Sequence, residues 1–361
     1  MTVDKKKLGL AFAASVICVL AGLILGFLIL ILINPAEAPA AMVTMLQNFL
    51  YYPRFDIAMY YLGMTIIKTT PVVMCALSFI YAKSAGLLNI GASGQYTLGA
   101  GAALFMAIGL KLPWWLCLIG AAVAGGLGGL LTGFLKAYRN ANEVIVGILI
   151  NWIALYLVNL LLDGYVNSFN YTLDLKTNAP QALIPNLGID KIFAGNTNAT
   201  LAIPLTIIAV IAVHYILSKT VLGYETRATG LNIHAARLAG MKEKENIMLT
   251  MFISGALCGL GAAFLFLCGA NQWQTSVSQV PNMGFDAMAA AFLGCLNPAG
   301  SLFASFFIQH INMGSMNINK MIYPKEVSQI VVAVIIYFSA FASTVVRFIA
   351  SRIEARKEKK Q

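Results

Sequence analysis

Charged residues are scarce in this sequence. Only 11% of its 361 residues are Asp, Glu, Lys or Arg, whereas soluble domains carry about 25%. Hydrophobic residues make up 59%, and the mean hydropathy is +0.79. This shortage of charge excludes an ordinary soluble protein and indicates that lipid covers most of the surface. The net charge of +10 does not indicate a nucleic-acid partner, because the basic residues lie in short segments between apolar runs.

Residue patterns for catalysis, metal binding and nucleotide binding are also missing. The six cysteines form no Cys-x-x-Cys pair and lie inside apolar runs, where free cysteine acts as a small hydrophobic residue. The three histidines are far apart in sequence, so no metal site is expected. The chain has no Gly-x-x-x-x-Gly-Lys-Ser/Thr loop and no clustered nucleophile and base. We therefore expect a chain that is not an enzyme and binds no cofactor.

Long apolar runs take the place of the missing charge, and a helix needs about 20 such residues to cross a bilayer. The candidate spans are 8–33, 59–82, 90–110, 113–137, 143–163, 201–218, 247–270, 284–296, 300–316 and 326–350. The eighth and ninth are short and are split by Leu296–Gly300, so they could form a re-entrant pair. The first is too long for a signal peptide, so we expect it to stay uncleaved. The sequence predicts an all-α polytopic membrane protein with eight to ten transmembrane helices, as one domain over 1–361 with its membrane core at 8–350.

The distribution of Lys and Arg predicts the orientation. If ten segments cross from a cytoplasmic N-terminus, 17 of the 24 basic residues fall inside and 6 outside. Basic residues are enriched in cytoplasmic loops, so we expect both termini in the cytoplasm and an even number of crossings. The loop at 164–200 is then external, whereas the loop at 219–246 and the charged tail at 351–361 are cytoplasmic.

The loop at 219–246 contains a short predicted helix. Asn232 can cap it by accepting hydrogen bonds from the amides of the first turn. Ile233, Ala236, Arg237 and Gly240 then recur at spacings of three and four residues. A small face is formed by the alanines Ala235, Ala236 and Ala239. About two turns of helix are unstable alone in water. The helix therefore either packs on its own chain or docks in a groove of a cytoplasmic partner.

Polar side chains and glycines interrupt the apolar pattern at 86–100. Four glycines weaken regular helix there and allow backbones to approach each other closely. Asn89, Ser93 and Gln95 lie in the same stretch. Irregular backbone is tolerated at membrane depth only beside protein or a wet cavity. The sequence therefore predicts an interrupted start of the third span, whose amides either bind a passing solute or satisfy the broken backbone.

Further polar residues lie within or at the ends of other spans. Trp152 and Tyr156 share a helix face near Asn151. Two aromatic rings and an amide could stack on and hydrogen-bond to a nucleobase or sugar ring. The alternative is that these side chains only pack between helices. Lys68 lies near mid-depth of the second span, and Asp286 stands at a helix start. The candidate residues of a solute path are Asn89, Ser93, Gln95, Asn151, Trp152, Tyr156, Lys68 and Asp286.

Four stretches together resemble the permease subunits of ABC importers for nucleosides and simple sugars. They are Ala85–Ala100, Asn142–Asn159, Gly230–Met241 and Gly284–Gly300, and the resemblance runs from about residue 60 to 350. Gly230–Met241, "GLNIHAARLAGM", resembles the coupling helix on which the ATPase docks. Ser93 departs from the nucleoside-type pattern, in which an acidic residue is expected.

The resemblance implies a type II ABC importer permease fold in a bacterial plasma (inner) membrane. It implies a second permease subunit, identical or homologous, cytoplasmic ABC ATPase subunits that use ATP-Mg, and an extracytoplasmic substrate-binding lipoprotein or periplasmic protein. The implied docking residues are Arg227, Asn232, Ala235, Ala236, Arg237 and Gly240. Nucleosides are the expected solutes, with simple sugars such as ribose or galactose, or branched-chain amino acids, as alternatives. An ion-coupled secondary carrier is the alternative of another class, although the spans contain almost no carboxylates to bind a coupling ion.

Overall fold

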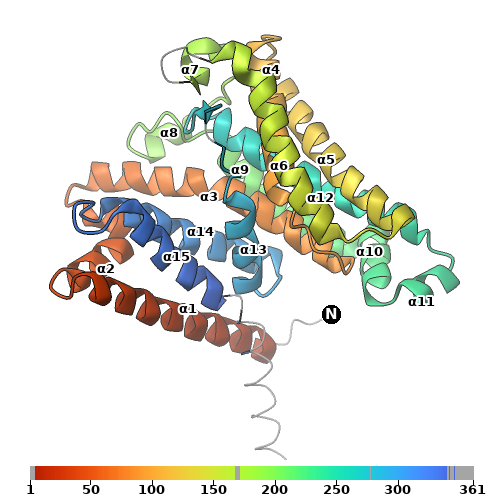
Figure 1. Ribbon diagram of the computed structural model, residues 1–361, viewed down its shortest axis with the longest axis horizontal. Coiled ribbons are helices and arrows are strands. Elements are labelled where there is room, and N and C mark those ends of the chain that lie inside the picture. Colours follow the sequence, from red (N-terminus) through yellow and green to blue (C-terminus); the bar gives the residue numbers. More distant parts are fainter. Residues whose placement is uncertain (1–4, 167–170, 277, 340, 342–344, 346–361) are drawn as a thin grey trace, which may run out of the picture. The chain divides into compact units, whose positions relative to one another are not determined.

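The structure is a computed structural model that describes residues 5–166, 171–276, 278–339, 341 and 345 (Figure 1). Within these ranges nearly all of the regular secondary structure is helical, which confirms the all-α prediction. The described strands are two residues each: β1 (Thr172–Leu173) pairs antiparallel with β2 (Trp273–Gln274). The tail at 351–361 and most of the last ten residues of the final expected span lie outside the described residues.

The longer helices follow the expected spans closely. They are α1 (Lys5–Ile33), α3 (Phe55–Ser84), α4 (Ala92–Ile108), α5 (Trp114–Arg139), α6 (Glu143–Leu162), α9 (Ala202–Lys219), α12 (Glu243–Phe266), α13 (Met283–Leu293), α14 (Pro298–Gly314) and α15 (Lys325–Ser339). The shorter ones are α2 (Ala38–Gln47), α7 (Leu175–Asn178), α8 (Ile189–Ile192), α10 (Val221–Leu231) and α11 (Ile233–Leu238). Among the described residues, six helices are long and apolar enough to cross a membrane: α1, α3, α5, α6, α9 and α12. The total of eight to ten crossings stays a prediction.

The eighth and ninth expected spans are two separate helices, α13 and α14. The chain turns between them with positive φ at Cys295 and Leu296. Asn297 then caps α14 by accepting hydrogen bonds from two backbone amides, with Pro298 at the first helical position. The break at Leu296–Gly300 is therefore a helix end followed by a capped helix start.

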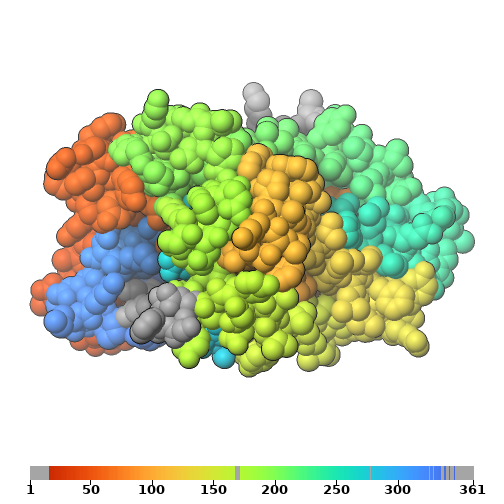
Figure 2. Space-filling view, turned by 90° about the horizontal axis from the view of Figure 1, so that it is seen from above, coloured from red at the N-terminus to blue at the C-terminus, as the bar shows by residue number. Residues whose placement is uncertain are grey.

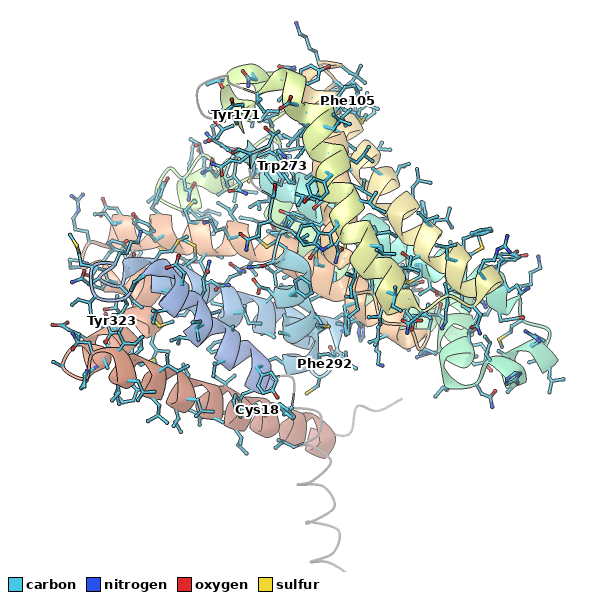
Figure 3. All side chains as sticks on the ribbon, in the orientation of Figure 1. Cys18, Phe105, Tyr171, Trp273, Phe292 and Tyr323 are labelled. Atoms are coloured by element: carbon cyan, nitrogen blue, oxygen red, sulfur yellow. The ribbon has the colours of Figure 1, made fainter. Side chains whose placement is uncertain are left out.

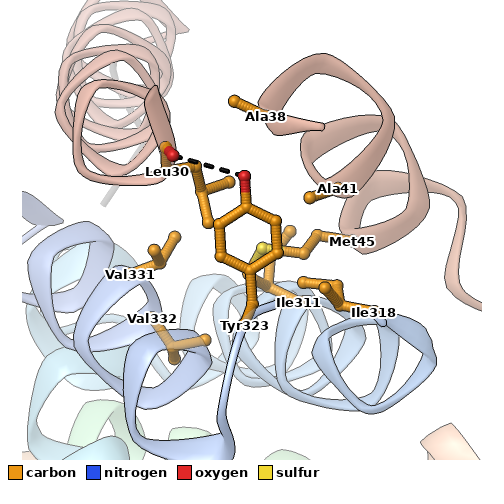
Figure 4. Close-up of a cluster of buried hydrophobic side chains, with 9 residues drawn as sticks. All are labelled: Leu30, Ala38, Ala41, Met45, Ile311, Ile318, Tyr323, Val331 and Val332. Atoms are coloured by element: carbon orange, nitrogen blue, oxygen red, sulfur yellow. Dashed lines mark hydrogen bonds between the residues drawn. The ribbon is translucent and has the colours of Figure 1, made fainter. Parts of the chain in front are cut away.

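The described chain divides into two compact units, one of residues 1–61 and 289–361 and the other of residues 62–288. The first unit packs α1, α2, α14 and α15 around a hydrophobic cluster with Tyr323 at its centre (Figure 4). The Tyr323 hydroxyl donates to the carbonyl oxygens of Leu30, at 3.3 Å, and Asn34, at 2.8 Å. The end of α1 is thereby tied to the segment before α15. The expectation of a single domain stays a prediction.

The second unit is built on close contact between α5, α12 and α4. Gly125 and Gly129 of α5 face Gly255 and Gly259 of α12 so closely that backbone lies against backbone. Gly99 of α4 lies against Gly259 in the same way. Glycines four residues apart fall on one face of a helix and allow this approach in a membrane. On another face of α4 the side chains of α6 lie alongside (Figure 2).

The glycine contacts predict a severe effect of added volume. A valine at Gly259 would place its side chain against the backbone of α5 at Ala121, which cannot rotate away. We expect Gly259→Val to destabilise the detergent-solubilised protein by about 1–3 kcal/mol or more, as overpacking does in other cores. Thermal unfolding followed by size-exclusion chromatography measures this. Gly164→Ala is the matched control, because no other described residue, its chain neighbours aside, has an atom within 4 Å of a methyl group placed there. Equal melting temperatures for both variants would contradict the prediction.

Candidate functional site: a polar pocket, a buried amide cluster and an exposed loop helix

The expected interruption before the third span is present between α3 and α4. Residues 85–91 are not helical, and Gly86 has a φ of +77°, which favours glycine. The carbonyl oxygen of Gly230, at the end of α10, would lie 3.1 Å from a methyl group placed on Gly86. The irregular segment therefore lies against the last turn of α10, just before α11.

Asn89 and Gln95 form the centre of a buried hydrogen-bond cluster. Asn89 Nδ2 donates to Gln95 Oε1 at 2.7 Å, and Gln95 Nε2 donates back to Asn89 Oδ1 at 3.0 Å. Asn89 Nδ2 also lies 3.0 Å from Ser78 Oγ and 2.9 Å from Ser254 Oγ, so the cluster joins α3, α4 and α12. Both amide side chains are at most 2% exposed. In this conformation the two amides pair with each other and with two serine hydroxyls and form no bond to the backbone of the interruption, so whether they bind a solute stays a prediction.

Asn151 has a comparable local role on α6. Its Oδ1 accepts a hydrogen bond from the backbone amide of Gly94 at 2.7 Å, and its Nδ2 donates to the carbonyl oxygen of Ile90 at 3.1 Å. The start of α4 is thus held by a side chain from a neighbouring helix, because Gly91, its N-cap residue, has no side chain to do so. Gly94 makes the contact possible, since its Cβ would lie 2.8 Å from Asn151 Cα.

An open polar pocket lies at the opposite end of α12 from α11. Its volume is about 670 Å³, within the range of small-molecule sites. The lining residues are Tyr96, Leu155, Phe266, Gly269, Ala270, Asn271, Gln272, Trp273, Gln274, Gln279, Pro281, Asn282, Met283 and Asp286. Five of them are amide side chains, one is a carboxylate, and none is Lys or Arg. The pocket can therefore both donate and accept hydrogen bonds but has no cationic side chain for an anion.

Trp273 forms the floor of this pocket together with Phe266 and Tyr96. Its indole Nε1 donates to Asn159 Oδ1 at 2.9 Å, and its ring lies 5.6 Å from that of Phe266. The β1–β2 pair holds the backbone of Trp273, which lies below Tyr171 in Figure 3. The floor is therefore fixed both by the hydrogen bond that Trp273 donates to α6 and by the loop that carries β1.

The structure places the other candidate path residues at different sites. Asp286 lines the pocket from the first turn of α13, and Ser93 is buried against Gly284. Trp152 and Tyr156 stack on each other but are 44% and 56% exposed on α6, outside the pocket lining. Lys68 is half-buried in α3, and no ion pair to it is formed among the described residues. Contact of any of these residues with a solute stays a prediction.

The sequence interpretation missed most of the pocket, which is formed by the segment between α12 and α13. The signal was present as a concentration of amides directly after a span. They are Asn271, Gln272, Gln274, Gln279 and Asn282. An amide-rich segment at the end of an apolar helix is typical of a surface that forms many hydrogen bonds.

The expected loop helix is present as α11, and its cap is confirmed. Asn232 Oδ1 accepts from the amides of His234 and Ala235, at 3.0 and 3.1 Å. Ala236 is buried against the chain, whereas Ala235, Ala239, Arg227, Arg237 and Gly240 are exposed. The most exposed large apolar side chains of the segment are Leu231 and Leu238, at 87% and 89%. The alanine face is therefore shared between the chain itself and solvent, and two leucines that the sequence interpretation did not single out face outward.

The α10–α11 segment also contacts the interruption before α4. A methyl group on Gly230 would lie 2.7 Å from the backbone of Ala85 and Gly86. Ile233 packs on a buried cluster, which consists of Ala82, Ala85, Leu87, Ile247 and Met251. Arg237 Nε donates to Glu243 Oε1 at 2.8 Å and so ties α11 to the start of α12.

These features define a multi-pass membrane protein with a polar pocket near one end of a helical bundle. Residues 61–340 match the family model described as "Branched-chain amino acid transport system / permease component", so the chain belongs to this family of transport permeases.

Several curated proteins are similar to the chain. The guanosine ABC transporter permease protein NupP of Bacillus subtilis is 33% identical over 302 residues, 82% of this chain and 85% of the relative. The nucleoside ABC transporter permease protein NupB of Lactococcus lactis is 31% identical over 77% of this chain and 79% of the relative. The glucose ABC transporter permease protein TsgB13 of Haloferax volcanii is 28% identical over 91% of this chain and 87% of the relative. No solved structure matches the chain.

The hydrogen bonds of Asn151 predict a loss of stability when they are removed. Asn151→Ala leaves the Gly94 amide and the Ile90 carbonyl unpaired inside the bundle. We expect the free energy of unfolding to fall by about 1–3 kcal/mol, the cost of unsatisfied buried polar groups. The measurement is thermal unfolding in detergent, with Tyr156→Phe as a control on the exposed face of the same helix. A melting temperature for Asn151→Ala that equals that of the control would show that these bonds do not stabilise the start of α4.

Proposed function

We propose that this chain is the membrane-spanning permease subunit of an ATP-driven importer for nucleosides. The observation that carries the proposal is the similarity, over most of the chain, to relatives named as guanosine and nucleoside permeases. The chain forms the solute path, and ATP is hydrolysed by partner ATPase subunits, since the sequence has no phosphate-binding loop of the Walker type.

The chemistry of the pocket supports a neutral, hydrogen-bonding solute. Amide side chains and a carboxylate can pair with the donors and acceptors of a nucleobase and with ribose hydroxyl groups. A branched-chain amino acid carries a carboxylate, and the lining residues include no Lys or Arg to pair with it. Simple sugars remain the second candidate, favoured by the relative named as a glucose permease.

The α10–α11 segment is suited to transmit work from an ATPase. Leu231 and Leu238 offer apolar side chains to a groove of a cytoplasmic partner, and the Arg237–Glu243 ion pair stiffens their support. Movement of this segment reaches α3 and α4 through Gly230 and Ile233. We place this segment and both termini in the cytoplasm. A second permease subunit completes the path, and an extracytoplasmic binding protein delivers solute at the pocket end.

An ion-coupled carrier is the competing function, and the energy source separates the two. In liposomes that contain the complete transporter, with both permease subunits, the ATPase subunits and the binding protein, uptake should require ATP and continue when an uncoupler removes ion gradients. Uptake by the purified chain alone, driven by an ion gradient, would refute the proposal.

The exposed leucines predict which change uncouples the ATPase. We expect Leu231→Ser combined with Leu238→Ser to abolish co-purification of the ATPase and to lower ATP-driven uptake at least tenfold. Ile192→Ser is the matched control, because Ile192 is also a large exposed apolar residue, at 64%, but lies in α8. Co-purification measured by gel densitometry should be unchanged in the control. Normal ATPase association of the double variant would exclude these leucines from docking.

The pocket predicts which solutes compete for uptake. Unlabelled guanosine or uridine should inhibit uptake of labelled guanosine, ribose should inhibit it weakly, and leucine or guanosine monophosphate should not inhibit it. Asp286→Asn should raise the KM for nucleoside about tenfold, because a charge-assisted hydrogen bond becomes a neutral one. Asp190→Asn in α8 is the control for loss of an acidic group. Strong inhibition by leucine would favour an amino acid permease instead.

A further inference from the structure

The pocket ends, on the side toward α11, at a contact between α4 and α13. Tyr96 of α4 and Met283 of α13 both line the pocket. One turn before Tyr96, toward the α11 end of α4, lies Ser93, and the residue after Met283 is Gly284. A methyl group on Gly284 would lie 2.5 Å from Ser93 Oγ and 2.7 Å from the Ser93 amide nitrogen. The two helices therefore touch here with no room for a side chain between them.

Ser93 has a fully buried hydroxyl group that forms no hydrogen bond with the described residues. A buried serine in a helix can donate to the carbonyl oxygen four residues earlier. For Ser93 that residue is Asn89, which lies in the irregular segment before α4. Thr97, one turn later, does form this bond, to the Ser93 carbonyl at 2.8 Å. An unpaired buried hydroxyl group is energetically unfavourable. A hydrogen bond from the Ser93 hydroxyl to water or to a solute would remove this cost.

Of the two helices at this contact, α4 has the better-defined restraints at its start. The start of α4 is fixed by Asn151, and Gly99 holds α4 against α12. α13 has only 11 residues and is bounded by irregular segments on both sides. Separation at Gly284 breaks no hydrogen bond between the Ser93 hydroxyl and the part of the chain that the structure describes.

We propose that the Ser93–Gly284 contact is the closed constriction of the solute path directly beyond the pocket. When the first turn of α13 moves away from α4, the Ser93 hydroxyl donates a hydrogen bond to a hydroxyl group of the passing solute. This inference rests on the proposed function for the identity of the solute, which is a ribonucleoside. The polar residues along the path are then Asp286 in the pocket and Ser93 in the constriction.

The first test compares solutes with and without ribose hydroxyl groups. In liposomes with the complete transporter, kcat/KM for guanosine should exceed that for 2′,3′-dideoxyguanosine about tenfold. In Ser93→Ala this ratio should fall severalfold, through a lower kcat for guanosine, while the pocket residues retain the remaining discrimination. Ser305→Ala is the matched control, because Ser305 is also buried without a hydrogen bond to the described residues but lies in α14 and not at the contact between α4 and α13. An unchanged ratio in Ser93→Ala would overturn the role of the hydroxyl group.

The second test measures the constriction without any solute. In a transporter whose native cysteines are replaced by serine or alanine, Ser93→Cys should react with a small methanethiosulfonate reagent during ATP turnover and be protected without ATP. Ser305→Cys should stay unreactive in both states. Gly284→Ala, which wedges the contact apart, should make Ser93→Cys reactive without ATP, with folding checked by size-exclusion chromatography. Protection of Ser93→Cys in every state would overturn the constriction, whereas failure of the unaltered transporter to take up guanosine would refute only the nucleoside assignment.

Discussion

Direct backbone contact between α5, α12 and α4 is the constraint on which the second unit depends. Glycines at positions 99, 125, 129, 255 and 259 let the three helices approach until no side chain separates them. In lipid, helices gain little from burying apolar surface, so association relies on such close packing and on hydrogen bonds. The polar cluster of Asn89 and Gln95 forms only because α3, α4 and α12 are held together. The floor of the pocket is placed by the same framework, through Tyr96 on α4 and Phe266 on α12.

Features set by local rules could be predicted from the sequence. The all-α class follows from apolar runs of span length, the break at 85–91 from its glycines, and the cap of α11 from Asn232 at the head of an alanine-rich segment. Each of these depends on neighbours within a few residues. The family assignment, from about residue 60 to 350 by motif and 61–340 by the matching family model, also followed from the sequence.

Features set by distant contacts could not be predicted. Asn89 meets Ser254, 165 residues away, so the sequence alone left open whether its amide faces a solute or the protein. Trp152 and Tyr156 do share a face, but the position of α4 against the other side of α6 turns that face outward. The pocket depends on the pairing of β1 with β2, two strands of two residues each that carry no recognisable strand pattern.

The contact between Gly230 and Gly86 has a mechanical consequence. In most helix–helix contacts, side chains lie between the two backbones and accommodate a small displacement by changing rotamer. No side chain lies between Gly230 and Gly86, because the backbone of α10 lies directly on the backbone of the α3–α4 connection. A displacement of α10 is therefore transmitted almost fully to the start of the α3–α4 connection. Glycine therefore makes the contact between α10 and the α3–α4 connection stiff, because neither residue has a side chain that could change its conformation.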